Sequence, residues 1–347
     1  MTHPATTSCL TPEREQGKPP TAALNVEHKH GAPPILCVDA FGDAARWAAE
    51  HRDALRATVT EHGSLLVRGL ALHDPAETEA VFRELGALTT EREAFAQRHI
   101  YAPGVYSASK WPPNQPMCVH HELSYAVEFP CLMLFACLTA ARSGGATPVA
   151  DAVAVLDALP TDLVERFERV GWLLVRNYSD DIGTSVAEAF GTEDRAAVES
   201  YCRANAIEFE WRRNGGLRTC QRRSAFVRHP LTGQRSWFNQ VAFLSEWSMN
   251  PEVREYLVEE YGDDGLPFNT RFGNGDPIAA DVVERINATY EANTVREPWQ
   301  AGDVMLVDNI RTAHGREAYE GPREVVVGMA DPVRRSDRPR ALAPAAG

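Results

Sequence analysis

Two short segments, far apart in the sequence, carry side chains that could together bind one metal ion. The first holds His120 and Glu122, and the second holds His314. Residues i and i+2 of an extended segment point to the same side, so His120 and Glu122 could contact one ion while His121 points away. Two imidazoles and one carboxylate on one face of the ion would leave three coordination positions open.

Two histidines and one carboxylate are the ligand set of non-haem Fe(II) oxygenases. In those enzymes the three open positions allow the metal to bind both a co-substrate and O2. Taken singly, each piece is weak, because an HxE pair arises by chance and a lone histidine such as His314, expected in a turn between two strands, is usually structural. A zinc protease would need a histidine where Tyr125 stands. The sequence has neither a GxSxG elbow nor a phosphate-binding P-loop.

The surrounding sequence predicts the elements that position these residues. Residues 100–118 are punctuated by proline and glycine and are expected to form the loop that leads to His120. Residues 130–138 form a continuous apolar run, as in a strand covered on both faces. Periodicity and end signals also predict strands at 35–38, 64–70, 172–176, 236–239, 304–307 and 324–329, and helices at 42–62, 74–86, 152–170, 193–205, 251–261 and 279–293.

No low-complexity linker divides the chain, which predicts one domain over residues 34–332. Residues 152–295 are interpreted as an insertion or lid within it. Residues 1–33 have little apolar periodicity and are interpreted as a mobile tail, and residues 333–347 as a second tail.

The 347-residue chain is acidic, with 35 basic and 48 acidic side chains and a formal net charge of −13. That sign opposes phosphate binding and predicts no nucleic-acid partner. No apolar run approaches the ~20 residues that span a bilayer, and the N-terminus lacks a signal-peptide pattern. A cytoplasmic protein without membrane contact is therefore expected. The seven scattered cysteines, without a CxxC pair, are expected to be reduced thiols.

Together these motifs resemble the TauD/TfdA superfamily of Fe(II)- and 2-oxoglutarate-dependent dioxygenases, most closely its syringomycin-type amino-acid hydroxylases. The matching pieces are R-G-L at 68–70, H-H-E-L-S-Y at 120–125, G-G-A-T at 144–147, N-Y at 177–178, L-R-T at 217–219, H-P-L-T-G at 229–233, W-F-N-Q at 237–240, D-N-I-R-T-A-H-G-R at 308–316, and Arg323. They occur in the family's order over most of the chain, which makes the resemblance specific.

The resemblance implies that His120, Glu122 and His314 hold Fe(II), with 2-oxoglutarate and O2 as co-substrates. Related halogenases are expected to carry a small residue where this chain has Glu122, which frees a coordination position for halide. Glu122 therefore favours oxygenation.

The resemblance also implies a 2-oxoglutarate site. Arg323 would pair with the far carboxylate, to which a guanidinium offers a bidentate and permanently charged partner, and Thr147 would add a hydroxyl. Arg316 competes for this role but is expected to brace the turn or to touch the substrate. Many family members carry a second arginine four residues after the first, where this chain has Val327, so the group that orients the near carboxylate stays open.

The implied fold is mainly β with flanking helices, built on a double-stranded β-helix (jelly roll) core with the insertion as a helical lid. The implied activity is hydroxylation of an unactivated C–H bond of an amino acid or amino-acid-derived small molecule in specialised metabolite (antibiotic) biosynthesis. Desaturation and epoxidation stay open. A binding protein without iron should have lost the ligands or Arg323, and a metal hydrolase on a similar barrel does not account for Thr147 and Arg323.

The sequence constrains the identity of the substrate-contacting residues least. The candidate residues are Ser124, Tyr125, Asn177, Arg218, Trp237, Phe238, Asn239 and Arg316. Asn239 is favoured because a polar side chain beside a strand often faces a ligand, while for Trp237 and Phe238 core and pocket are equally expected. Arginines gather in residues 212–235, and solvated surface is favoured for them. The alternative is recognition of an anionic substrate or of an acidic partner such as a carrier protein. The sequence predicts no oligomeric state.

Overall fold

The computed structural model describes residues 24–39, 42–91, 98–213 and 215–335, and its largest element is a seven-stranded sheet. The strand order is β1 (Ile35–Cys37), β2 (Ser64–Arg68), β16 (Val304–Asp308), β6 (Glu128–Thr139), β19 (Glu324–Arg334), β4 (Val105–Ser107) and β3 (Ile100–Ala102). The apolar run predicted at 130–138 lies in β6, between β16 and β19. Its burial on both faces follows from that central position.

A four-stranded sheet carries part of the candidate site. Its order is β15 (Thr294–Val295), β8 (Val149–Asp151), β17 (Thr312–Arg316) and β5 (Met117–His120). Phe135 and Val327 of the large sheet share one hydrophobic cluster with Val149 and Ala313 of this sheet. The two sheets therefore contribute to a common core.

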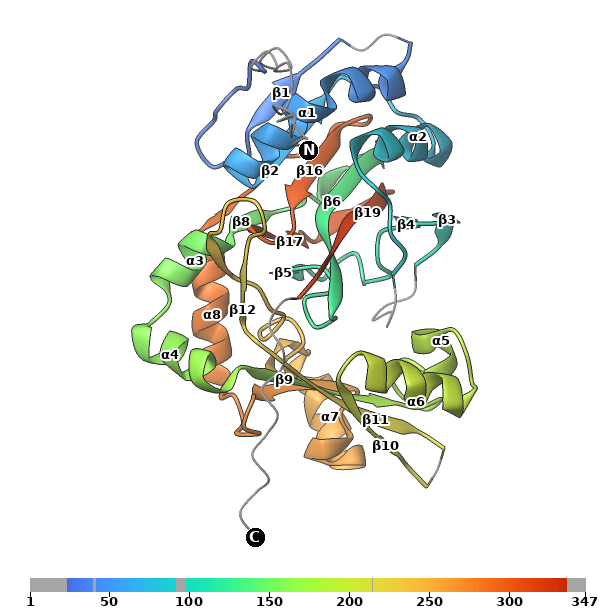
Figure 1. Ribbon diagram of the computed structural model, residues 1–347, viewed down its shortest axis with the longest axis vertical. Helices are drawn as coiled ribbons and strands as arrows, with labels where there is room; N and C mark the ends of the chain where they lie inside the picture. Colours follow the sequence, from blue (N-terminus) through green and yellow to red (C-terminus); the bar gives the residue numbers. More distant parts are fainter. Residues whose placement is uncertain (1–23, 40–41, 92–97, 214, 336–347) are drawn as a thin grey trace, which may run out of the picture.

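Two helices cover the other face of the large sheet (Figure 1). They are α1 (Ala44–His62) and α2 (Pro75–Leu85). Leu55 of α1 and Phe82 of α2 are buried in one cluster with Leu65 and Leu134 of the sheet. Asp74 caps α2, because its side chain accepts from the backbone N–H groups of Ala76 and Glu77.

The predicted insertion contains helices and a sheet of its own. The helices are α3 (Ala152–Ala158), α4 (Thr161–Val170), α5 (Val186–Phe190), α6 (Arg195–Ala204), α7 (Pro251–Tyr261) and α8 (Ala280–Ala292), with short 3-10 turns at Glu246–Ser248 and Asp263–Gly265. The antiparallel sheet has the order β10 (Ile207–Trp211), β11 (Leu217–Arg223), β9 (Trp172–Tyr178) and β14 (Phe268–Phe272). Two small two-stranded sheets complete the described strands: β12 (Phe226–Arg228) with β13 (Arg235–Trp237), and β7 (Ser143–Gly144) with β18 (Tyr319–Glu320).

Several predicted elements differ from the structure. The helix expected at 152–170 is two helices, because Pro160 lacks an N–H and disfavours helical backbone at Leu159. The loop expected at 100–118 contains β3, β4 and the start of β5. Strand β19 runs through Arg334, past the expected domain end at 332, and Glu27 of the expected N-terminal tail bridges to Ile35. The remainder of both tails, residues 1–23 and 336–347, lies outside the described residues.

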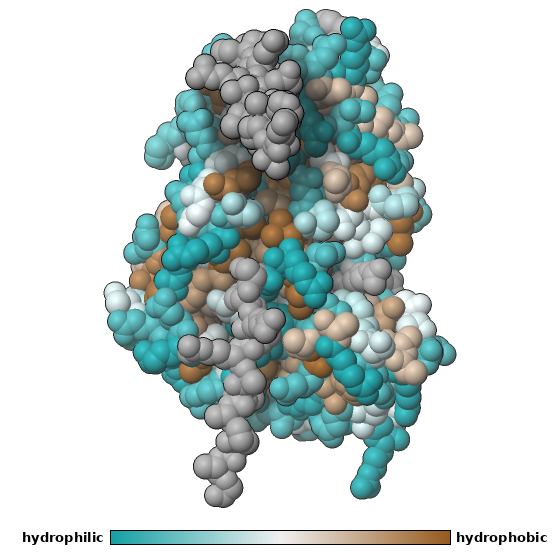
Figure 2. Space-filling view, viewed as in Figure 1, coloured by the Kyte–Doolittle hydropathy of each residue, from teal (hydrophilic) through white to brown (hydrophobic). Residues whose placement is uncertain are grey.

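On the face shown in Figure 2, hydrophilic residues cover the upper and lower parts and hydrophobic residues gather between them. Among the described helices, none is long and apolar enough to cross a membrane.

Candidate metal centre

The fold brings His120, Glu122 and His314 together. His120 ends β5 and pairs directly with His314 across the sheet. His314 thus lies inside strand β17, which corrects the expected turn, and Glu122 lies in the turn after β5, which corrects the expected extended segment. One potential ligand atom from each of the three residues lies within 4.8 Å of the others, and all three side chains are buried. His314 Nε2 is 3.9 Å from Glu122 Oε2.

The amide of Asn309 holds the turn that carries Glu122. Its Oδ1 accepts from Glu122 N at 2.8 Å, and its Nδ2 donates to the carbonyl oxygens of Glu122 at 3.0 Å and Pro130 at 2.8 Å. The next residue, Leu123, has a φ of +52°, a left-handed conformation that is strained for a leucine. His121 points away, as predicted, and its Nδ1 bonds the Asn309 carbonyl at 2.6 Å. The position of the Glu122 carboxylate therefore depends on Asn309.

Replacing Asn309 by alanine is expected to weaken both folding and metal binding. Each buried group left unpaired costs about 1–3 kcal/mol, and a misplaced ligand typically lowers metal affinity about 10- to 100-fold. Denaturant unfolding and Fe(II) titration would measure the two effects. Asn309→Asp keeps the acceptor and loses the donor, so it should fall between wild type and Asn309→Ala. An alanine variant that binds Fe(II) as tightly as wild type would contradict this role.

Both histidines have the electronic state that a metal ligand needs. His120 Nδ1 donates to the Cys118 carbonyl at 2.9 Å, which leaves Nε2 with its lone pair. Burial lowers the pKa of His120 and lowers that of His314 further, so both rings are neutral at pH 7. Phe243 stacks on His120 with ring centroids 4.3 Å apart. The centre thus offers two neutral imidazoles and one carboxylate, a donor set that fits Fe(II).

Arg98 is part of this centre and was missed in the sequence. Its Nη2 donates to Glu122 Oε2 at 3.0 Å, and its side chain is 9% exposed. Burial alone would raise the pKa of Glu122, but the charge and hydrogen bond of Arg98, with a contribution from His120, lower it overall. Glu122 is therefore ionised at neutral pH. No motif marked Arg98, because its contact with Glu122 depends on the tertiary fold.

One cavity is lined by all five residues predicted to bind iron and 2-oxoglutarate, namely His120, Glu122, His314, Thr147 and Arg323. Its lining residues are Arg98, Ala108, Ser109, Met117, His120, Glu122, Phe135, Thr147, His314, Gly315, Arg316, Arg323, Val325 and Val327. Side chains from four segments that are distant in sequence thus converge on the same space.

Arg323 and Thr147 could hold an anion in this cavity. Arg323 Nε donates to the Gly145 carbonyl at 2.9 Å, its one hydrogen bond to a described residue. Burial lowers the pKa of Arg323 to about 10, so it remains charged at pH 7. Gly145 has a φ of +75°, and a Cβ there would lie 3.1 Å from the Arg323 side chain, so the glycine permits this approach. Thr147 Oγ1 accepts from Trp299 Nε1 at 3.2 Å, which leaves the threonine hydrogen free to donate.

Arg316 braces a loop. Its terminal nitrogens donate to the carbonyl oxygens of Trp111, Pro112 and Gln115. Its guanidinium is largely committed to the backbone, although the side chain lines the cavity. This arrangement fits the bracing role that was one of the two expected for Arg316.

The other substrate candidates lie away from this cavity. Trp237 and Phe238 are fully buried in the hydrophobic core. Asn239 bonds Ala225 O and Val241 N, so its amide stabilises local backbone. Ser124 and Tyr125 are also buried, and neither lines the cavity. Polar and aromatic residues near a motif are often structural. Here tertiary packing places Trp237 and Phe238 in the hydrophobic core.

Arg218 and Asn177 belong to the insertion. They are opposite each other on β11 and β9, and both bond the Asp264 carbonyl. Asn177 lines a separate cavity with Lys110 and Trp111.

Comparisons with known proteins agree with this geometry. The model of the family described as "Taurine catabolism dioxygenase TauD, TfdA family" matches residues 32–329. The chain is 36% identical over 276 residues to dapdiamide synthesis protein DdaC of Enterobacter agglomerans. The aligned region covers 79% of this chain and 84% of that protein. It is 27% identical over 323 residues to a clavaminate synthase-like protein of Arabidopsis thaliana, covering 90% and 91%. A taurine dioxygenase structure from Burkholderia xenovorans superposes with a TM-score of 0.50 at 18% identity, covering 91% of this chain and 93% of that one.

Proposed function

Because the chain belongs to the TauD/TfdA family and is an Fe(II)- and 2-oxoglutarate-dependent dioxygenase, we propose that it hydroxylates an unactivated C–H bond of an amino acid or amino-acid-derived small molecule. The observation that carries this proposal is the single cavity lined by His120, Glu122, His314, Thr147 and Arg323. The biological setting is specialised metabolite biosynthesis, as the name of the similar protein DdaC indicates for that protein.

His120, Glu122 and His314 are assigned as the iron ligands. When bound, Fe(II) supplies the chemistry that uses 2-oxoglutarate and O2 to oxidise a C–H bond. The chain's part is to keep both imidazoles neutral, to keep Glu122 ionised beside Arg98, and to bring the three donor atoms within 4.8 Å of one another, where they would hold the ion. Glu122 also fills the position that a halide would need, which favours oxygenation over halogenation.

Arg323 and Thr147 are assigned to the far carboxylate of 2-oxoglutarate. The terminal nitrogens of Arg323 would pair with it, and the Thr147 hydroxyl would donate to it. Val327 lines the same cavity and supplies no charge for the near carboxylate.

Trp299 orients the Thr147 hydroxyl, which makes Trp299→Phe a specific probe of this site. Loss of one hydrogen bond worth about 0.5–1.5 kcal/mol should raise the 2-oxoglutarate KM about 2- to 10-fold and leave kcat near wild type. Steady-state kinetics would measure this, and the effects of Trp299→Phe and Thr147→Val should not be additive. Trp247→Phe removes a comparable indole hydrogen bond, to Ile278 O, and serves as the control. Equal KM changes in both tryptophan variants would refute the role of Trp299.

The proposed architecture is a jelly roll whose two sheets are the seven-stranded and the four-stranded sheets, with the proposed iron ligands at the face between them. Their shared hydrophobic cluster supports this. Residues 34–332 would form the oxygenase domain and 152–295 its insertion.

A small substrate is favoured over a carrier-tethered one. Three arginines of the 212–235 segment pair with acids of the same chain: Arg212 with Glu210, Arg218 with Asp264, and Arg235 with Glu168. Arg223 is buried and bonds backbone carbonyls. The basic surface available to an acidic carrier protein is therefore reduced.

Turnover with a panel of amino acids, analysed by mass spectrometry, tests the proposal. A gain of one oxygen is expected. Loss of two hydrogens would instead indicate the desaturase alternative, and oxygen gain at an alkene the epoxidase alternative. No Fe(II)-dependent succinate release under any condition would overturn the proposed function.

A further inference from the structure

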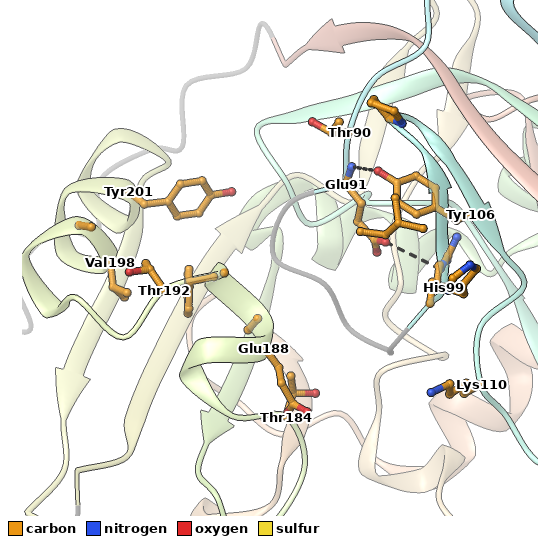
Figure 3. Close-up of a pocket in the computed structure, with 17 residues that line it drawn as sticks. Thr90, Glu91, His99, Tyr106, Lys110, Thr184, Glu188, Thr192, Val198 and Tyr201 are labelled. Carbon is orange, nitrogen blue, oxygen red and sulfur yellow. Dashed lines mark hydrogen bonds and ion pairs between the residues drawn. The ribbon is translucent and has the colours of Figure 1, made fainter. Parts of the chain in front are cut away.

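Arg98 lies where the iron-site cavity meets a much larger one. The large cavity has a volume of about 960 Å³ and, like the iron-site cavity, is lined by Arg98. Figure 3 shows Glu91 and Tyr106 of the core on one side of it, with Val198 and Tyr201 of α6 on the other. A substrate in this space would reach the proposed iron ligands past Arg98.

The hydrogen bonds of Arg98 leave part of its guanidinium unused. Nη2 donates to Glu122, while Nε is buried and has no hydrogen-bond partner among the described residues. Among the described residues, the other acid that pairs with Arg98 is Glu91, whose Oε2 is 3.8 Å from Nε, close enough for an ion pair and too far for a hydrogen bond.

Metal binding would weaken the negative charge that Glu122 presents to Arg98. Glu122 is the proposed ligand, and its negative charge would be shared with the ion. Arginine stays charged under all ordinary conditions, and a buried cation without a full counter-charge is costly. The loaded site would therefore favour a further anion beside Arg98, on the side of the large cavity.

We propose that Arg98 binds a carboxylate group of the substrate, which occupies the large cavity between the core and helices α5 and α6. The substrate class is a free carboxylic acid, in line with an amino acid that keeps its α-carboxylate, and an acid that is esterified to a carrier would lack this contact. The inference rests on the proposed oxygenase function. Carboxylate and guanidinium match in charge and in bidentate geometry, which makes this pairing selective over an amide.

Binding experiments test this without requiring turnover. Full-length protein is loaded with Mn(II) and 2-oxoglutarate and titrated by calorimetry with the proteinogenic L-amino acids and their N-acetyl forms, each as the free acid and as the carboxamide. Acids that bind should do so about 10- to 100-fold more tightly than their amides. Arg98→Gln should reduce that ratio to about one, and Arg98→Lys should retain part of it. Lys110→Gln removes another basic side chain that lines this cavity, and the ratio should survive that change.

Each alternative outcome has a defined meaning. The proposal is overturned if the wild-type protein binds no acid of the panel, or binds acids and amides equally. It is also overturned if the ratio disappears in Lys110→Gln, or if Arg98→Lys keeps none of it. Loss of 2-oxoglutarate affinity in Arg98→Gln, with the acid preference intact, would assign Arg98 to the co-substrate instead. Succinate release from 2-oxoglutarate by the wild-type protein tests the oxygenase function separately, so the two ideas can fail independently.

Discussion

His314→Ala is expected to abolish Fe(II)-dependent release of succinate from 2-oxoglutarate. The variant removes one of two neutral imidazoles and leaves a cavity between Glu122 and His120 where the third donor stood. Metal catalysis contributes several kcal/mol of transition-state stabilisation, so a loss of about 1000-fold or more in turnover is expected. Metal titration should show weakened Fe(II) binding in parallel.

The control is a histidine outside the site. His73 lies just before α2, is mostly exposed and pairs with Glu77 in the first turn of that helix, so His73→Ala should keep wild-type turnover and metal affinity. Circular dichroism and denaturant unfolding must show that His314→Ala remains folded, because β17 is buried. Undiminished succinate release by a folded His314→Ala protein would remove His314 from the site.

Local sequence signals accounted for much of the scaffold. Helix α7 has the predicted bounds, and α2 begins after its Asp74 cap, because capping and helical periodicity act within a few residues. The family and its cofactors were also identified correctly from the order of motifs. Strand β17 was missed, and His314 was expected in a turn, because pairing with β5 and β8, which are distant in sequence, extends the chain there.

The parts of the site that the sequence did not reveal depend on long-range contacts. Arg98 meets Glu122, and Trp299 meets Thr147, through the tertiary fold, and no local pattern indicates either contact. Asn309 belonged to a recognised motif, but its role in holding the Glu122 turn appears only in the hydrogen bonds. Conversely, Trp237 and Phe238 could face either core or pocket on sequence grounds, and packing placed them in the core.

Arg323→Ala is expected to raise the 2-oxoglutarate KM strongly. Arg323 is partly buried and lines the iron-site cavity, and its hydrogen bond to the described residues is the one that Nε donates to Gly145 O. Removing one member of a buried ion pair costs about 3–5 kcal/mol, which corresponds to a rise of about 100- to 1000-fold in KM where KM reports binding. Arg323→Lys keeps the charge and loses the bidentate geometry, so a smaller rise is expected.

Comparing Arg316→Ala with Arg323→Ala shows whether 2-oxoglutarate binding needs any arginine in the cavity or needs the one at position 323. It lies in the same cavity, but its terminal nitrogens hold the carbonyl oxygens of Trp111, Pro112 and Gln115. Arg316→Ala should therefore lower the unfolding free energy by about 1–3 kcal/mol for each carbonyl left unpaired, with a smaller effect on the 2-oxoglutarate KM than Arg323→Ala. Direct 2-oxoglutarate titration of the Mn(II)-loaded variants would rank them without relying on turnover. An unchanged affinity in Arg323→Ala, together with a large loss in a folded Arg316→Ala protein, would transfer the carboxylate-binding role to Arg316.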